Sequence, residues 1–204
     1  MSAQIPLAKI AELRDSTPNM LALRLQEQEV CGYWKVIFSS RGVATLTKQD
    51  MTGFLSYRQN KRWREISKED VTSDMEALRA ALAVLIDESR PVAERLNELE
   101  PGRGALAVPF LGKAKLSAIL LVTQPREYGV WNDYSERALR GLGVMPEFAA
   151  GAGVDAGADG HPPVARLGDQ YALVNAALKK LADNNRLTMW QLDIILERIA
   201  RLVR

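Results

Sequence analysis

The chain has very little of the chemistry that builds disulfides or metal centres. Its 204 residues include one cysteine, Cys31, and one histidine, His161. A single cysteine excludes an internal disulfide, and together the two residues are too few for a Cys/His zinc site. We therefore expect no metal and no cofactor, with Cys31 in the core and His161 exposed on a loop.

Long apolar runs and a strong charge imbalance are also missing. The longest apolar stretch, residues 117–123, is far too short to span a bilayer. The N-terminus has no long apolar segment of the kind that signal peptides carry. Because the formal net charge is only +2, a basic surface for nucleic acid would have to be local. These features predict a cytoplasmic protein with no membrane contact.

What the chain does have is apolar residues at helical spacing and residues that start helices. Its hydrophobic content of 47% and charged content of 25% are ordinary for a globular protein, and its length is enough to bury a core. We predict an all-α fold in which residues 1–204 form one domain of about eight to nine helices.

The first half of the chain gives several predictions about individual helices. A helix from residue 19 to about 30 should turn Leu21, Leu25 and Gln28 inward. Residues 33–39, YWKVIFS, fit a strand by composition and a helix by length and context; we predict a helix. Gly42 should end that helix.

Capping residues mark further helix starts. Thr47 with Asp50 predicts a capping box, followed by a helix that carries Met51, Phe54 and Leu55 inward. Thr72 or Ser73 should cap a long helix that runs through Asp87, Pro91 should start the next one, and Thr188 should cap the last. Residues 148–168 are rich in Gly, Ala and Pro and predict a mobile surface insertion before a helix at 169–182.

The rest of the chain is organised around residues 108–142. A short apolar hairpin, VPFLG at 108–112, comes before a helix that begins at Lys113. The first amides of a helix lack partners and lie at the positive end of its dipole, so they favour an anion. Gly112 would let a phosphate approach, and Lys113 and Lys115 add charge. The alternative is an ordinary helix start with two solvated lysines.

Two motifs in this stretch resemble the base-excision DNA glycosylase superfamily. VPFLG followed by KAK is similar to its helix-hairpin-helix element, Leu-Pro-Gly-Val-Gly and a helix. YGVWND at 128–133 lies where that superfamily has the loop with its catalytic aspartate. The resemblance covers roughly residues 91–142, with the helix-hairpin-helix element at about 91–124. It implies DNA contacts from Phe110, Leu111, Gly112, Lys113 and Lys115.

The departures from the superfamily restrict the chemistry that the resemblance implies. Ala114 stands where the bifunctional enzymes have their lysine nucleophile, so a Schiff-base lyase is not expected. Phe110 replaces the first glycine of the hairpin, so the turn must differ or the ring must serve as a wedge or core plug. Asp133, or Asn132 with a shift of one residue, takes the catalytic position, and only Asp133 would supply a charge to stabilise an oxocarbenium-like sugar. The alternative is that one of the two caps the next helix, with Glu136 completing a box with Asp133.

A basic loop with aromatic residues supplies further candidates for DNA contact. Lys61, Arg62 and Arg64 surround Trp63, a mixture that suits backbone contact and base stacking. If this loop meets residues 128–133, a flipped base would have aromatic walls and polar partners on its edge. That base pocket would be formed by Asn60, Trp63, Trp131 and Asn132. The alternative is that both tryptophans fill the core and the cations are solvated.

Three functions follow, with DNA as the expected partner in the first two. The first is a monofunctional DNA glycosylase. The second is a non-catalytic module that binds nucleic acid or a modified base, because residues 60–63 and 128–132 also resemble uncharacterised helical proteins found near bacterial restriction and defence systems. The third is a helical protein-interaction domain. The sequence leaves the oligomeric state open.

Overall fold

The computed structural model describes residues 4–17, 20–57, 66–148 and 165–203. Within these ranges every regular element is a helix, which confirms the all-α fold, and the helices number eleven rather than eight to nine. In chain order they are α1 (Ala8–Asp15), α2 (Met20–Ile37), α3 (Ser40–Ala44), α4 (Lys48–Ser56), α5 (Ile66–Val71), α6 (Met75–Leu85), α7 (Val92–Glu98), α8 (Lys113–Thr123), α9 (Asp133–Gly141), α10 (Leu167–Asn184) and α11 (Met189–Leu202).

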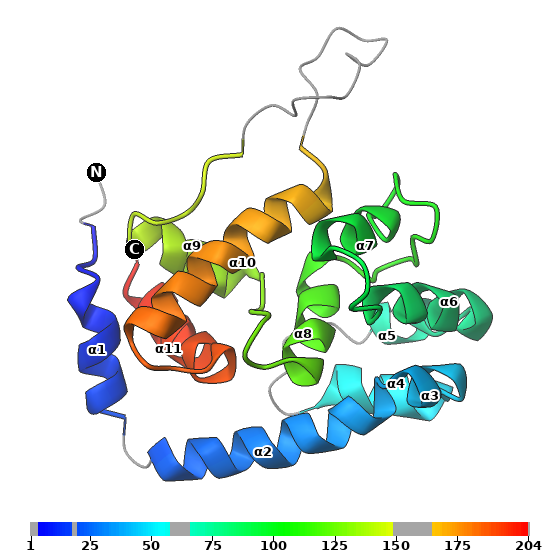
Figure 1. Ribbon diagram of the computed structural model, residues 1–204, viewed down its shortest axis with the longest axis horizontal. Coiled ribbons are helices and arrows are strands. Elements are labelled where there is room, and N and C mark those ends of the chain that lie inside the picture. Colours follow the sequence, from blue (N-terminus) through cyan, green and yellow to red (C-terminus); the bar gives the residue numbers. More distant parts are fainter. Residues whose placement is uncertain (1–3, 18–19, 58–65, 149–164, 204) are drawn as a thin grey trace, which may run out of the picture.

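Helix α8 lies at the centre of the molecule, with other helices on several sides (Figure 1). Every residue from 116 to 123 is buried, because this helix is apolar around its whole circumference rather than along one stripe. The buried apolar residues form one connected core that extends from Ile10 to Ala200. The helix that follows the predicted hairpin is therefore also the main core helix.

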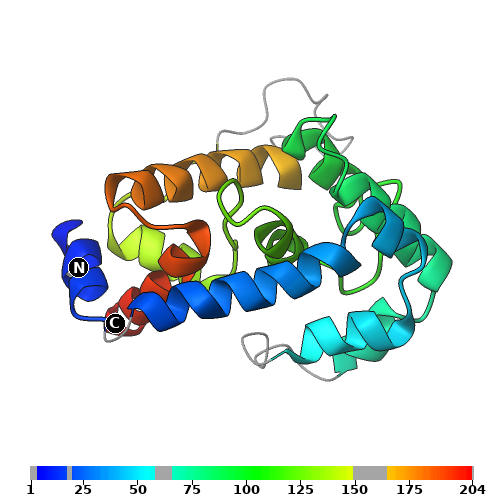
Figure 2. The same cartoon turned by 60° about the horizontal axis from the view of Figure 1, so that its bottom comes forward.

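Two groups of helices flank α8, and α2 runs along both (Figures 1 and 2). On one side α11 packs against α1, α9 and α10, and on the other α6 packs against α3 and α7. Helix α2 contacts α8, α3 and α11, while α10 packs extensively on α7. In the described ranges no helix has both the length and the apolar character needed to cross a bilayer.

Two of the predicted helix starts are confirmed by their capping bonds. Thr47 and Asp50 form a capping box at the start of α4, and Thr188 forms one with Gln191 at the start of α11. The prediction for α6 was wrong, because its N-cap is Asp74, whose carboxylate accepts hydrogen bonds from the amides of Glu76 and Ala77. A carboxylate at this position also stabilises the helix dipole, and α6 ends at Leu85, before Asp87.

Helix α2 differs from its prediction in length and in orientation. It continues to Ile37, so residues 33–37 are helical as predicted. The predicted inward face was wrong: Leu21 and Leu25 are 67% and 58% exposed, while Val30 and Trp34 are buried. Two apolar stripes occupy opposite sides of this helix, and periodicity alone did not indicate which one faces the core.

Two further boundaries were predicted wrongly. Gly42 does not end a helix but lies within α3, where an added Cβ would come 2.3 Å from the carbonyl oxygen of Ile37. The chain breaks instead at Ser39, whose hydroxyl accepts a hydrogen bond from the Gly42 amide. Helix α10 begins at Leu167, inside the predicted insertion at 148–168, and residues 149–164 of that insertion lie outside the described ranges.

Candidate nucleic-acid interface

The predicted hairpin is a tight turn with an exposed aromatic ring at its tip. The amide of Leu111 donates to the carbonyl oxygen of Val108 at 3.1 Å, and Phe110 has a φ of +61°. Proline second and a positive φ third are the features of a type II turn, in which the third residue is usually glycine. Phe110 thus holds a backbone conformation that glycine usually supplies. Its ring is 58% exposed, so it does not plug the core.

The turn leads directly into an uncapped helix start. Gly112 is the N-cap of α8 and supplies no side-chain acceptor. The amides of Lys115 and Leu116 donate to the Gly112 carbonyl, which leaves those of Lys113 and Ala114 at the end of the helix. No atom lies within 4 Å of where a Gly112 Cβ would be, so the backbone can be approached there. Leu111, by contrast, is buried and anchors the turn.

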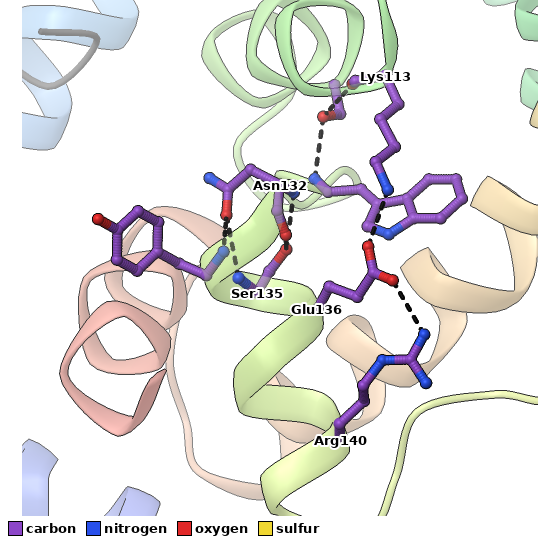
Figure 3. Close-up of polar contacts among 8 residues, drawn as sticks. Lys113, Asn132, Ser135, Glu136 and Arg140 are labelled. Carbon is purple, nitrogen blue, oxygen red and sulfur yellow. Dashed lines mark hydrogen bonds and ion pairs between the residues drawn. The ribbon is translucent and has the colours of Figure 1, made fainter. Parts of the chain in front are cut away.

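The two lysines beside this helix start are both engaged within the molecule. The Lys115 ammonium donates to the Phe110 carbonyl at 2.8 Å, and burial lowers its pKa. Lys113 Nζ pairs with Glu136 Oε2 at 2.8 Å and lies 4.3 Å from the centre of the Trp131 ring (Figure 3). Neither lysine is therefore freely solvated, as the alternative interpretation of an ordinary helix start had it.

Glu136 on α9 is held between two cations. Besides Lys113, its carboxylate accepts a hydrogen bond from Arg140 at 3.0 Å (Figure 3). Burial alone would raise the pKa of Glu136, but the bonds from Lys113 and Arg140 hold that pKa below its ordinary value. This carboxylate therefore stays charged and fixes the start of α8 against α9.

Trp131 belongs to the core rather than to an open base pocket. It is 2% exposed, and its ring lies 5.8 Å from that of Phe148. Its backbone amide donates to Ser117 Oγ at 2.9 Å, and Ser117 Oγ donates to the Lys113 carbonyl at 2.7 Å (Figure 3). The tryptophan thus joins the first turns of α8 to the segment before α9.

Asn132 and Asp133 have different positions at the start of α9. Asn132 is the N-cap: its Oδ1 accepts from the amides of Tyr134 and Ser135 at 2.9 and 3.0 Å, and Ser135 Oγ completes the capping box. The box thus joins Asn132 to Ser135, not Asp133 to Glu136. Asp133 is the first residue of the helix and is exposed. Its catalytic role stays a prediction.

The remaining predicted site residues cannot be compared with the structure. Asn60, Lys61, Arg62, Trp63 and Arg64 lie outside the described residues, so the meeting of the two loops stays a prediction. A hollow of about 570 Å³ borders Phe148, whose ring contacts that of Trp131. It is lined by Arg140, Gly143, Met145, Pro146, Glu147 and Phe148, without Asn132 or Asp133.

A polar cluster around the buried Arg95, which the sequence did not reveal, holds Tyr128 in place. Arg95 on α7 is 1% exposed. Its guanidinium donates to Glu88 Oε1 and to Tyr128 Oη, each at 2.7 Å, and to the Leu85 carbonyl at 2.6 Å. Tyr128 Oη donates in turn to Glu88 Oε2 at 2.8 Å. The one available signal was an arginine among the inward apolar residues of α7.

Helix α10 holds the next residue of the same segment. The Gly129 amide donates to Asn175 Oδ1 at 2.8 Å, and its carbonyl accepts from Tyr171 Oη at 2.9 Å. Burial raises the pKa of Tyr171 well above its ordinary value, so this hydroxyl remains a donor. An added Cβ on Gly129 would lie 2.7 Å from Leu178 Cδ1, which explains the glycine. These bonds fix the segment before α9 to α10.

The geometry thus brings together the Phe110 turn, the open end of α8 and the start of α9. The glycosylase resemblance rests on the sequence motifs quoted above. Comparison with protein-family models, with curated proteins and with solved structures found no match to this chain.

Proposed function

We propose that the protein binds nucleic acid through the Phe110 turn and the first residues of α8. The observation that carries the proposal is Phe110 itself. It exposes more than half of an apolar ring and holds a backbone conformation that costs a non-glycine residue about 1–2 kcal/mol. Strain of this kind persists mainly where the residue has a function, and the ring adjoins an open helix start.

The proposed contact combines an anion site with an apolar wedge. A phosphate would accept hydrogen bonds from the amides of Lys113 and Ala114, which lie at the positive end of the α8 dipole. Phe110 would then lie beside the backbone, where an aromatic ring can stack on a base or insert between two bases. Because Lys113 is already paired with Glu136, the amides and Lys115 would supply most of the attraction.

The binding experiment measures fluorescence anisotropy of labelled single-stranded and double-stranded oligonucleotides at low salt. We expect saturable binding that weakens with added salt, because phosphate contacts release counterions. Phe110→Ala should lower affinity by about tenfold, the loss of roughly one stacked ring. Leu173→Ala, which removes another exposed apolar side chain on α10, should bind as the wild type does. Absence of binding to every oligonucleotide would refute the proposal.

Base excision is a second candidate, and the position of Asp133 favours it. Its exposed carboxylate begins α9, and α9 is fixed to the start of α8 by the Lys113–Glu136 pair. A base extruded beside Phe110 would place its sugar near this end of α9, where a carboxylate could stabilise developing positive charge. The active form would be a monofunctional glycosylase.

Excision is tested by release of free base from duplexes that carry a panel of damaged or modified bases. The expected result is release by the wild type and loss of release in Asp133→Asn, with oligonucleotide binding retained. Binding without release from any substrate would leave the non-catalytic module as the function. Release that is unchanged in Asp133→Asn would remove this residue from the mechanism.

A further inference from the structure

The outer face of α2 is apolar and uncovered. Leu21, Leu25 and Val36 are 67%, 58% and 69% exposed, and no atom lies within 4 Å of where a Gly32 Cβ would be. Helix α2 crosses the front of the molecule in Figure 2 with no other helix over it. Its buried side, with Val30 and Trp34, already packs on the core, so this second apolar side has no partner among the residues that the structure describes.

The spacing of this outer face is that of a helix seam. Leu21, Leu25, Gln28 and Gly32 are separated by four, three and four residues, and all are exposed. At 100° per residue these four positions fall within about 60° of one another. This is the a/d pattern through which two helices pack side by side, and Gly32 would let two backbones approach closely. We define these four residues as the α2 seam.

Two opposite charges flank the α2 seam in the positions that pair across such an interface. Arg24 lies on one flank and Glu29 on the other, five residues later, and both are exposed. Neither forms an ion pair with another described residue. In a parallel helix pair, a residue on the flank that Arg24 occupies faces the residue five positions later on the other helix, which here is Glu29.

We propose that the protein forms a parallel homodimer through the α2 seam, with Arg24 of each copy paired to Glu29 of the other. The two-fold axis produces this pair twice, so the surface is self-complementary in charge. An antiparallel arrangement is disfavoured, because each flank of the seam would then face the same flank of the other copy, and Arg24 could not meet Glu29. A buried Gln28 pair would fix the register. This inference is independent of nucleic-acid binding.

Charge exchange between the flanks tests both the partner and its direction. At about 100 µM, a concentration that detects a modest interface, the wild type should sediment at about twice its mass of 22.6 kDa. Arg24→Glu alone and Glu29→Arg alone each place like charges together twice, and both should shift the mass towards the monomer. Their equimolar mixture should form heterodimers, and the double variant should dimerise as the wild type does. Leu25→Asp should give a monomer that keeps its helical circular dichroism.

Cysteine cross-linking gives an independent measure of direction. In a parallel pair two copies of Leu21→Cys meet across the axis, whereas an antiparallel pair that sets Leu21 beside Gly32 of the other copy separates them by about 16 Å along the helix. The native Cys31 does not compete, because it is buried and burial raises its pKa to about 12. Mild oxidation should give disulfide-linked dimers of Leu21→Cys and none of Leu173→Cys. A wild type that is monomeric at every concentration, or charge variants that all dimerise alike, would overturn the proposal.

Discussion

At the scale of single residues, Glu27 is a carboxylate whose burial opposes its charged form. It is 9% exposed on α2, and its Oε2 accepts a hydrogen bond from Thr188 Oγ1 at 2.9 Å, at the start of α11. Burial raises the pKa of Glu27, and the Thr188 bond with the charges of Arg126 and Arg24 offsets only part of the rise. The residue therefore links two helices while opposing the charged form of the folded state.

The raised pKa of Glu27 predicts how its neutralisation affects stability. Because the folded pKa exceeds the unfolded one, the folded state binds more protons between the two values, and stability falls as pH rises through that window. Glu27→Gln keeps an acceptor for Thr188 without the charge, so we expect about 1 kcal/mol more stability at pH 7. The gain should disappear below about pH 4, where both states of the wild type are protonated.

Urea denaturation of both proteins at pH 7 and at pH 4 measures this difference. Glu29→Gln, at the exposed position two residues later on α2, serves as the control and should change stability little at protein concentrations that keep the chain monomeric. A Glu27→Gln variant that is less stable than the wild type at pH 7 would show that the charged hydrogen bond to Thr188 outweighs the cost of burial.

Phe110 offers the opposite case, a residue whose backbone is strained and whose side chain is free. Phe110→Gly should raise the free energy of unfolding by up to about 1 kcal/mol, because glycine adopts the positive φ at no steric cost. Phe110→Ala removes the same ring but keeps the strain, so it should not share this gain. Thermal or urea unfolding of the two variants measures the difference. A less stable Phe110→Gly would mean that the ring stabilises the fold more than the turn strains it.

At the scale of elements, the starts of several helices could be predicted from the sequence because they depend on neighbouring residues. Thr47 and Thr188 cap helices by bonding to amides three residues away, and the helix beginning at Lys113 follows a proline turn and a glycine. The inward face of α2 could not be predicted in this way. Both of its sides are apolar, and only contact with α8, α3 and α11 selects the side with Trp34.

The candidate interface could likewise be predicted from the sequence only where it depends on neighbouring residues. The turn at 108–111 and the open start of α8 follow from a local pattern, and the structure contains both. In the cluster of Arg95, Glu88 and Tyr128, the tyrosine lies 33 and 40 positions from its two partners. Trp131 contacts Ser117 and Phe148, which are 14 and 17 positions away. A single sequence carries no signal for such pairs, so the site's fixed framework appeared only in the structure.

At the scale of the whole molecule, the packing of α10 on α7 joins the two groups of helices. Arg166 pairs with Glu100 and donates to the Asn97 carbonyl at 2.7 Å, just before α10 begins. The Gly168 amide donates to Asn97 Oδ1, also at 2.7 Å. The start of α10 is therefore held by the end of α7, and the same helix then fixes Gly129 beside the candidate interface.

Gly168 is the position at which this packing is closest, and its replacement should disturb the whole molecule. An added Cβ would lie 1.9 Å from the Ala93 carbonyl oxygen, which is backbone and cannot rotate away. Gly168→Ala should therefore move α10 away from α7 and lower the free energy of unfolding by about 2–3 kcal/mol. The Gly129 bonds to α10 should loosen with it, seen as faster amide hydrogen exchange across residues 128–131.

Gly53→Ala is the matched control, because this glycine is exposed in α4 and its nearest neighbour, a Trp34 side-chain carbon, would be 3.7 Å from the new Cβ. Alanine is the better helix former, so the control should gain up to about 1 kcal/mol. Equal effects of the two substitutions in chemical denaturation would contradict the close contact between α7 and α10. A loss confined to Gly168→Ala, together with weaker oligonucleotide binding, would connect that contact to the proposed interface through the bonds at Gly129.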